Sequence, residues 1–168
     1  DVYKRQVLSG SPSDAEFVQA CCDQLEAFGI AHEARVLSAH RQGEALHAFM
    51  AESEGQGCQV YIAMAGMAAH LPGVIAAMTP IPVIGVPIKA SLDGMDSLLA
   101  IVQMPPGIPV ATVAINGALN AGILAAQILA SGDEAMLQKT ITYKENLKKK
   151  IVKANEDLGE VKYNFKTN

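Results

Sequence analysis

The chain of 168 residues carries a formal net charge of −4, and half of its residues are hydrophobic although only 5% are aromatic. This length fits one domain with a substantial core, which Ala, Val, Ile, Leu and Met must build, as in buried parallel strands. The acidic balance argues against a nucleic-acid partner, and no apolar run reaches the roughly 18 residues of a membrane span, so we expect neither nucleic acid nor membrane as a partner.

The amino-terminal segment suits a buried strand poorly. Three polar residues at positions 4–6 stand where apolar side chains are expected, and Val7-Leu8 alone represents a first strand. We interpret residues 1–6 as a non-native stub before a single domain that spans residues 1–168.

Apolar runs alternate with helical patterns along most of the chain. A helix is predicted from Ser13, because Ser13-Asp14-Ala15-Glu16 has the S-x-x-E form of a capping box, to Gly29, where a glycine stops it. In chain order the pattern then predicts a strand at 34–37, a helix at 44–50, a strand at 60–65, a helix at 71–78, a strand at 83–86, a loop at 88–93, a helix at 95–102, a strand at 110–114 and a helix at 116–130. This alternation predicts an α/β fold, a three-layer αβα sandwich around a doubly wound parallel sheet of about five strands.

The carboxy-terminal pattern is one long helix at 133–155. Apolar residues follow one side of it, among them Leu137, Ile141 and Ile151, and lysines follow the other side. The lysine face is interpreted as solvated, whereas the apolar side of a helix outside the sheet needs a partner surface. We therefore expect this helix to pack on a neighbouring subunit and to be followed by a polar tail at 156–168.

The three cysteines, Cys21, Cys22 and Cys58, favour a reducing compartment. Their number is odd and their spacing lacks the pairs of a zinc site, so we expect small buried thiols and a cytoplasmic protein. The sequence contains no cluster of His, Cys and carboxylates with metal-ligand spacing, and so it implies no metal.

Three turns with polar or small residues follow strand candidates. They are Gly10-Ser11-Pro12-Ser13-Asp14, Ser38-Ala39-His40-Arg41 and Ala65-Gly66-Met67-Ala68-Ala69-His70-Leu71-Pro72-Gly73. Because parallel strands end at the same edge of a sheet, the turns are expected to converge on one small-molecule site. Glycine and alanine let a ligand approach the backbone closely, and the helices that follow offer free N–H groups to an anion.

The side chains in these turns suit an anionic sugar ligand and a proton transfer. The hydroxyls of Ser11 and Ser13 can hold a phosphate, whereas Asp14 repels phosphate and suits ribose hydroxyls. An imidazole, the side chain of His40, can both donate and accept a proton in one catalytic cycle, and Arg41 is shaped for a phosphate or carboxylate. Each turn also has a structural alternative, namely helix capping, a solvent-facing histidine and arginine, or a hydrogen-bonded histidine in a packing turn.

Six ordered motifs carry a resemblance to a known family. Besides the three turns they are Gly94-Met95-Asp96-Ser97-Leu98-Leu99, Ile101-Val102-Gln103-Met104-Pro105 and Asn120-Ala121-Gly122-Ile123-Leu124-Ala125-Ala126-Gln127-Ile128-Leu129. Over residues 7–152 the chain resembles the N5-carboxyaminoimidazole ribonucleotide mutases of bacterial de novo purine synthesis. The resemblance implies a cofactor-free isomerase, a homo-octamer of flavodoxin-like subunits with active sites near subunit contacts.

The resemblance also implies a reaction and roles for the residues at matching positions. The reaction converts N5-carboxyaminoimidazole ribonucleotide to 4-carboxy-5-aminoimidazole ribonucleotide, with CO2 enclosed in a dry pocket between the two steps. The implied catalytic residues are His40, as general acid and base, and His70. The implied substrate-binding residues are Ser11, Ser13, Asp14, Ser38, Arg41, Gly66, Ala68, Ala69 and Leu71.

Two alternatives accompany this interpretation. The related enzymes that carboxylate aminoimidazole ribonucleotide directly with CO2 have Lys after their Ser-Ala-His and lack the second histidine, so Arg41 and His70 favour the mutases. A non-catalytic nucleotide-binding relative is the other alternative, and it would not need His40.

Overall fold

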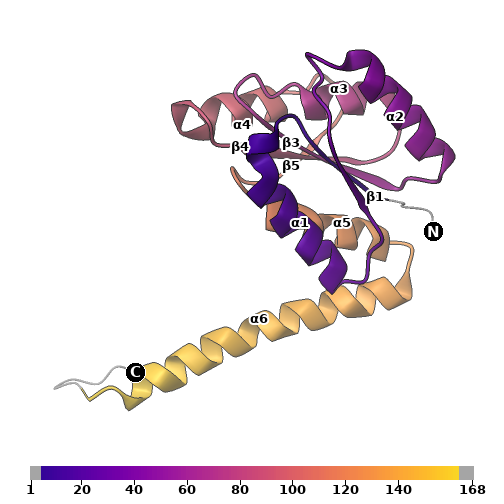
Figure 1. Cartoon of the computed structure of the whole chain (residues 1–168). Helices are drawn as coiled ribbons and strands as arrows, with labels where there is room; N and C mark the ends of the chain where they lie inside the picture. The colour runs from indigo at the N-terminus through magenta and orange to yellow at the C-terminus, as the bar shows by residue number, and fades with distance from the viewer. Residues whose placement is uncertain (1–4, 163–168) are drawn as a thin grey trace.

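The predicted alternation of strands and helices is present in the structure (Figure 1). The computed structural model describes residues 5–162. The strands are β1 (Arg5–Ser9), β2 (Glu33–Val36), β3 (Val60–Gly66), β4 (Val83–Ile88) and β5 (Ala111–Thr112). The helices are α1 (Ala15–Ala27), α2 (Gly43–Gly55), α3 (Leu71–Met78), α4 (Met95–Val102), α5 (Ala118–Ala130) and α6 (Glu134–Glu160), with 3₁₀ turns at Pro12–Asp14 and Leu92–Gly94.

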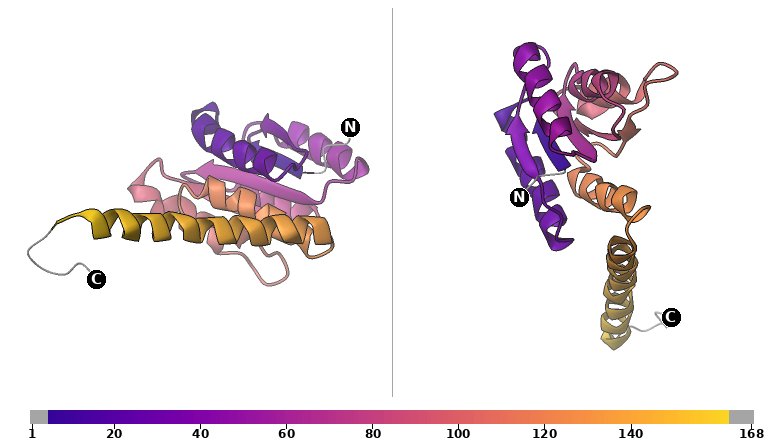
Figure 2. Two further views of the ribbon diagram at one scale, coloured as in Figure 1. Left: turned by 90° about the horizontal axis from the view of Figure 1, so that it is seen from below. Right: turned by 90° about the vertical axis from the view of Figure 1, so that its right-hand side faces the viewer.

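The five strands of the described chain form one parallel sheet in the order β2-β1-β3-β4-β5. β3 lies at its centre, so that Ala63 stands opposite Leu8 of β1 and Gly85 of β4. Figures 1 and 2 show α1 and α5 on one face of the sheet and α2, α3 and α4 on the other. This strand order is that of flavodoxin-like folds, and the predicted three-layer αβα sandwich is confirmed.

Small apolar side chains fill both faces of the sheet, as the composition requires. Neighbouring residues of β1 point to opposite faces, Val7 to the side of α1 and α5 and Leu8 to the side of α2 and α3. α5 approaches the sheet through Ala121, Ala125 and Ala126, which are fully buried. The near-continuous burial of β3 and β4 is expected of parallel strands covered on both sides.

The edge of the sheet formed by β4 and β5 differs from the prediction. β4 continues through Pro87 to Ile88, two residues beyond its predicted end, and β5 is shorter than the predicted strand at 110–114. Because β5 pairs only with Ile84 and Gly85, Pro87 lies beyond that pairing, where its missing N–H is not needed. A proline that ends a strand in the sequence pattern is therefore accommodated inside it.

α1 and α5 begin later than the sequence predicts. The Oγ of Ser11, rather than that of Ser13, caps the 3₁₀ turn, accepting a hydrogen bond from the Ser13 N–H at 3.2 Å. Pro12 is preset for a first helical turn, so this extra turn precedes α1 and the predicted capping box at Ser13 is wrong. Asn116 adopts a left-handed φ of 60°, and α5 starts after it, at Ala118.

β1 includes Arg5 and Gln6, which suit a buried strand poorly by their side chains. Gln6 is fully buried and stands in register with Glu33 of β2 and Tyr61 of β3. The strand extends through these residues because its backbone hydrogen bonds to β2 and β3 do not depend on the side chain. The interpretation of residues 1–6 as non-native stays a prediction, and residues 1–4 lie outside the described residues.

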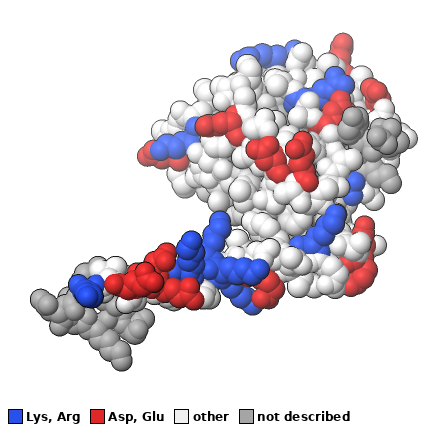
Figure 3. All heavy atoms as spheres, turned by 60° about the horizontal axis from the view of Figure 1, so that its bottom comes forward, with Lys and Arg blue, Asp and Glu red and all other residues white. Residues whose placement is uncertain are grey.

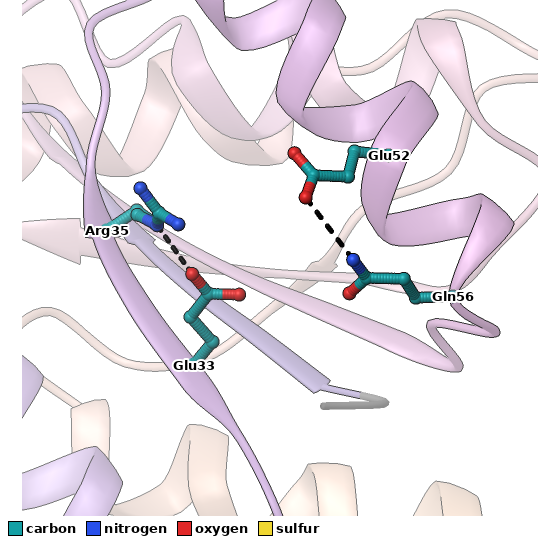
Figure 4. Close-up of polar contacts among 4 residues, drawn as sticks. All are labelled: Glu33, Arg35, Glu52 and Gln56. Carbon is teal, nitrogen blue, oxygen red and sulfur yellow. Dashed lines mark hydrogen bonds and ion pairs between the residues drawn. The ribbon is translucent and has the colours of Figure 1, made fainter. Parts of the chain in front are cut away.

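β2 is the other edge strand, and it carries charge there (Figure 4). Arg35 Nε donates to Glu33 Oε1 at 2.6 Å, and its guanidinium lies 5.5 Å from the ring centre of Phe49 in α2. At the end of α2, Gln56 Nε2 donates to Glu52 Oε1 at 3.3 Å. Charged side chains on an edge strand discourage pairing with a foreign strand.

α6 is longer than predicted, and only its first part packs on the domain. Asp133 caps its first turn, Lys139 Nζ donates to the Phe28 carbonyl at 2.8 Å, and Tyr143 lies 5.5 Å from the Phe28 ring. Beyond these contacts α6 projects away from the sheet (Figures 1 and 2). Residues 156–160, predicted as tail, continue the helix, and residues 163–168 lie outside the described residues.

The projecting half of α6 presents both apolar and charged side chains. Ile151 is 67% exposed and Val152 is 55% exposed in the single chain. Figure 3 shows lysines gathered along the middle of the helix and acidic side chains beyond them. The expectation that this helix packs on a neighbouring subunit stays a prediction. Its physical reason is that these apolar residues are exposed in the single chain.

Candidate functional site

The turns after β1, β2 and β3 meet at the carboxyl edge of the sheet. The strand order reverses between β1 and β3, and such a switch point opens a crevice in parallel sheets. A cleft of about 320 Å³ lies there. The described residues that line it are Gly10, Ser11, Ser13, Asp14, Ser38, Ala39, His40, Arg41, Ala65, Gly66, Met67, Ala68, His70, Leu71 and Ala90.

A larger hollow of about 610 Å³ lies between residues 76–83 and residues 107–111. The residues that line it are almost all apolar, and none of those described there is ionisable. It is therefore the smaller cleft that holds groups able to bind an anion and to transfer a proton.

The cleft brings together all the predicted site residues except Ala69. That residue is 1% exposed, and its N–H donates to the Met67 carbonyl at 2.8 Å, so it supports the turn from beneath. Motif reasoning missed Ala90, which follows β4. The signal that could have found it was present, because the predicted loop at 88–93 follows a parallel strand and so starts at the carboxyl edge.

The two predicted catalytic histidines touch each other. His40 Nε2 and His70 Nδ1 are 2.7 Å apart, in a hydrogen bond whose donor depends on the tautomer. The rings meet edge to face, with centroids 4.8 Å apart and an interplanar angle of 71°. A proton that reaches one ring can therefore pass to the other without crossing solvent.

Each histidine is positioned by a local turn. Ser38 Oγ accepts a hydrogen bond from the Arg41 N–H at 3.2 Å, and the Ser38 carbonyl accepts one from the Gln42 N–H at 2.9 Å, so the turn that carries His40 is closed. His70 is the residue before α3, and its carbonyl accepts the first helical hydrogen bond, from Val74 N–H at 2.9 Å. The pair is thus held between the start of α2 and the start of α3.

The hydroxyls and charges of the first turn form the other wall of the cleft. Ser11 Oγ and Ser13 Oγ lie 2.8 Å apart in front of α1. Asp14 is 5% exposed, and burial raises the pKa of its carboxyl above the ordinary value. Arg41, across the cleft and exposed, supplies the positive charge. This arrangement can hold a phosphate against hydroxyls and a guanidinium, with a hydrogen-bonding carboxyl beside it.

Two features of other protein classes are absent from the described residues. Within residues 5–162, no group of three or more His, Cys, Asp or Glu side chains is arranged to hold a metal ion. None of the helices in that part of the chain combines the length and the apolarity needed to span a bilayer.

Comparisons with known proteins show which family the chain resembles. The family model described as AIR carboxylase matches residues 5–150. The N5-carboxyaminoimidazole ribonucleotide mutase of Saccharolobus solfataricus is 51% identical over 156 residues, which cover 92% of this chain and 92% of that protein. The chloroplastic phosphoribosylaminoimidazole carboxylase of Vigna aconitifolia is 46% identical over 152 residues, which cover 90% of this chain but 27% of that longer protein.

A solved structure shares the fold over nearly its full length. The crystal structure of Treponema denticola PurE matches with a TM-score of 0.84 and 29% sequence identity, covering 92% of this chain and 97% of that one. Because the family model spans most of the sequence and a relative about half identical in sequence matches almost end to end, the chain belongs to the AIR carboxylase family.

Proposed function

We propose that this protein is an N5-carboxyaminoimidazole ribonucleotide mutase, an isomerase of de novo purine synthesis. The observation that carries the proposal is the 2.7 Å contact between His40 and His70 inside a cleft lined by Ser11, Asp14 and Arg41. Relatives with that name that match along most of their own length support it.

The reaction moves a carboxylate from the exocyclic nitrogen to ring carbon C4 of the aminoimidazole. The N–C bond of the carbamate breaks, CO2 leaves, and the nitrogen takes a proton. C4 then attacks the CO2, and the ring regains its aromatic state when C4 loses its proton. One proton is given and one is taken back, so a single imidazole near neutrality can serve both steps. His40 is assigned this role, and His70 holds its ring in place and shares the proton.

The nucleotide is held by residues of all three turns. Its phosphate lies against the hydroxyls of Ser11 and Ser13 and the guanidinium of Arg41, a charge-assisted contact. The Asp14 carboxyl receives the ribose hydroxyls, away from the phosphate that it would repel. Ser38, Gly66, Ala68 and Leu71 line the space around the base, and Ala69 supports that turn from beneath.

Three finer properties belong to the same proposal. The reaction balances in atoms and electrons within the substrate, which supports a mutase that needs no cofactor. The free thiols of Cys21, Cys22 and Cys58 support a cytoplasmic location, because oxidising compartments favour disulfides. The exposed apolar residues of α6 support assembly into a homo-octamer.

A direct carboxylase is the second candidate, favoured by the name of the Vigna aconitifolia relative. That enzyme class would join free CO2 to aminoimidazole ribonucleotide in place of an internal transfer.

The deciding assay mixes purified protein with N5-carboxyaminoimidazole ribonucleotide, without metal, ATP or added bicarbonate, and follows ultraviolet absorbance for the C4-carboxylated product. Rapid conversion supports the mutase. Turnover only from aminoimidazole ribonucleotide with high bicarbonate supports the carboxylase, and inactivity in both assays supports a binding-only relative.

A further inference from the structure

Met67 is an unusual residue for its backbone conformation. It has a left-handed φ of 56°, in the turn between β3 and α3. The turn is tight, because the Ala69 N–H donates to the Met67 carbonyl and the His70 N–H donates to the Ala68 carbonyl, each at 2.8 Å. Glycine adopts such a φ without cost, whereas a side chain with a Cβ meets the backbone. A bulky residue in this conformation that also lines a cleft is a candidate for a function of its side chain.

The described part of the chain offers the Met67 side chain no contact that would compensate this backbone strain. Asn116, also left-handed, is compensated because its Oδ1 accepts a hydrogen bond from the Lys89 N–H at 2.9 Å. Asp93, another such residue, pairs through its Oδ1 with Lys89 Nζ at 3.1 Å. The Met67 side chain has no polar group to offer and stays 60% exposed, so it gains little from burial. Leu92 is also left-handed and exposed, but it is not among the described residues that line the cleft; Met67 combines the strained turn with a place at the cleft, where a contact absent from the single chain can compensate the strain.

The position of Met67 identifies that missing contact. It lines the same cleft as His40 and His70. A methionine side chain is unbranched, polarizable and able to adapt its shape to an apolar surface. CO2 is the apolar participant in the proposed reaction, the aminoimidazole ring offers it a flat aromatic face, and CO2 is lost to solvent if nothing covers it.

We propose that the Met67 side chain covers the cleft during the reaction and keeps released CO2 beside the aminoimidazole ring until the new C–C bond forms. This inference rests on the proposed mutase function and gives Met67 a positioning role within it. In the productive path the substrate's own carboxyl carbon becomes the C4 carboxyl. In the leak that Met67 prevents, the same N–C bond breaks and the same proton is taken up, but CO2 and aminoimidazole ribonucleotide leave separately.

The test measures how the reaction partitions, not how fast it runs. Each protein is mixed with N5-carboxyaminoimidazole ribonucleotide in buffer that contains 13C-bicarbonate, and mass spectrometry gives two ratios. One is aminoimidazole ribonucleotide to 4-carboxylated product, and the other is the 13C content of that product. An enzyme-free blank is subtracted, since carbamates also lose CO2 unaided.

Met67→Gly is the informative variant, because glycine suits the left-handed turn and removes only the cover. It is expected to raise both ratios several-fold over wild type, and Met67→Leu, which restores an apolar side chain, is expected to return them most of the way. Leu92→Gly is the matched control. Leu92 has a φ of 44° and is 74% exposed, but it is not among the described residues that line the cleft. Both ratios for this variant should therefore match wild type.

The possible failures are distinguishable. If wild type makes no 4-carboxylated product from N5-carboxyaminoimidazole ribonucleotide, the proposed function is wrong. If wild type makes that product with little 13C and Met67→Gly gives the same ratios, the role of Met67 is wrong while the mutase stands. Light scattering covers one further outcome: a Met67→Gly variant with altered assembly and unchanged ratios would show that the side chain contacts another subunit, which also overturns the proposal.

Discussion

Replacement of Gly85 by alanine should destabilise the fold and disturb the nearby site. Gly85 lies in β4, and a Cβ built there would stand 2.5 Å from Ile101 Cγ2, 2.9 Å from Val110 Cγ1 and 3.3 Å from Pro72 Cβ. Ile101 is fully buried and cannot turn its methyl group into solvent. The absence of a side chain at Gly85 is therefore what lets α3 and α4 pack closely on this strand.

The magnitude follows from two opposing effects. Forcing an extra methyl group into a packed core costs about 1–3 kcal/mol. Removing the freedom of a glycine from the unfolded chain returns about 0.4–1 kcal/mol. The free energy of unfolding should thus fall by about 1–2 kcal/mol, which lowers Tm by about 2–8 °C for a chain of this size.

The assay is thermal unfolding followed by circular dichroism at one fixed protein concentration, since assembly makes Tm depend on concentration. Gly55→Ala at the end of α2 is the control, because a Cβ there meets nothing within 4 Å, and its Tm should match or exceed that of wild type. The added methyl also presses on Pro72, two residues after His70, so kcat/KM should fall as well. A Gly85→Ala variant as stable as Gly55→Ala would refute the close packing of α3 and α4 on β4.

The remaining predictions concern the cleft. His40→Asn should lower kcat by about 10²–10⁴-fold while calorimetry still detects nucleotide binding, and near-normal turnover would remove His40 from proton transfer. Arg41→Ala should weaken nucleotide affinity by about 10- to 150-fold, because a hydrogen bond to a charged group contributes about 1.5–3 kcal/mol, and an unchanged Kd would contradict the phosphate contact. Burial raises the pKa of Asp14 in the folded state, so the stability that its protonated form contributes is present below the unfolded pKa and lost as pH rises through the folded pKa. Urea unfolding of Asp14→Asn should therefore show a smaller loss of stability than wild type on going from acid to neutral pH, and parallel curves would contradict the sign.

The sequence was sufficient for the architecture because periodicity reports local burial. The helices at 71–78 and 95–102 are observed with the predicted bounds, and the observed strands contain or overlap the predicted ones. The candidate site was also accessible, because the turns after parallel strands must meet at one sheet edge whatever the side chains are. The strand through Pro87 and the length of β5 escaped prediction, since each depends on pairing with another strand. The first capping residue, the starts of α1 and α5 and the full lengths of β1, α2 and α6 also differ from the prediction.

Distances between residues far apart in the chain were decided by the tertiary structure alone. His40 and His70 are 30 positions apart, and their 2.7 Å contact depends on the register of β2 and of β3 against β1 and on the angles of two turns. The tertiary structure also decided that Ala69 is buried and Met67 is exposed. The two residues stand close together in one motif, and only the backbone angles of the turn separate them. The sequence determined which residues reach the carboxyl edge, because that follows from local pattern and parallel topology. Which of them touch, and which face the cleft, was set by packing, because no local pattern encodes a contact made across the sheet.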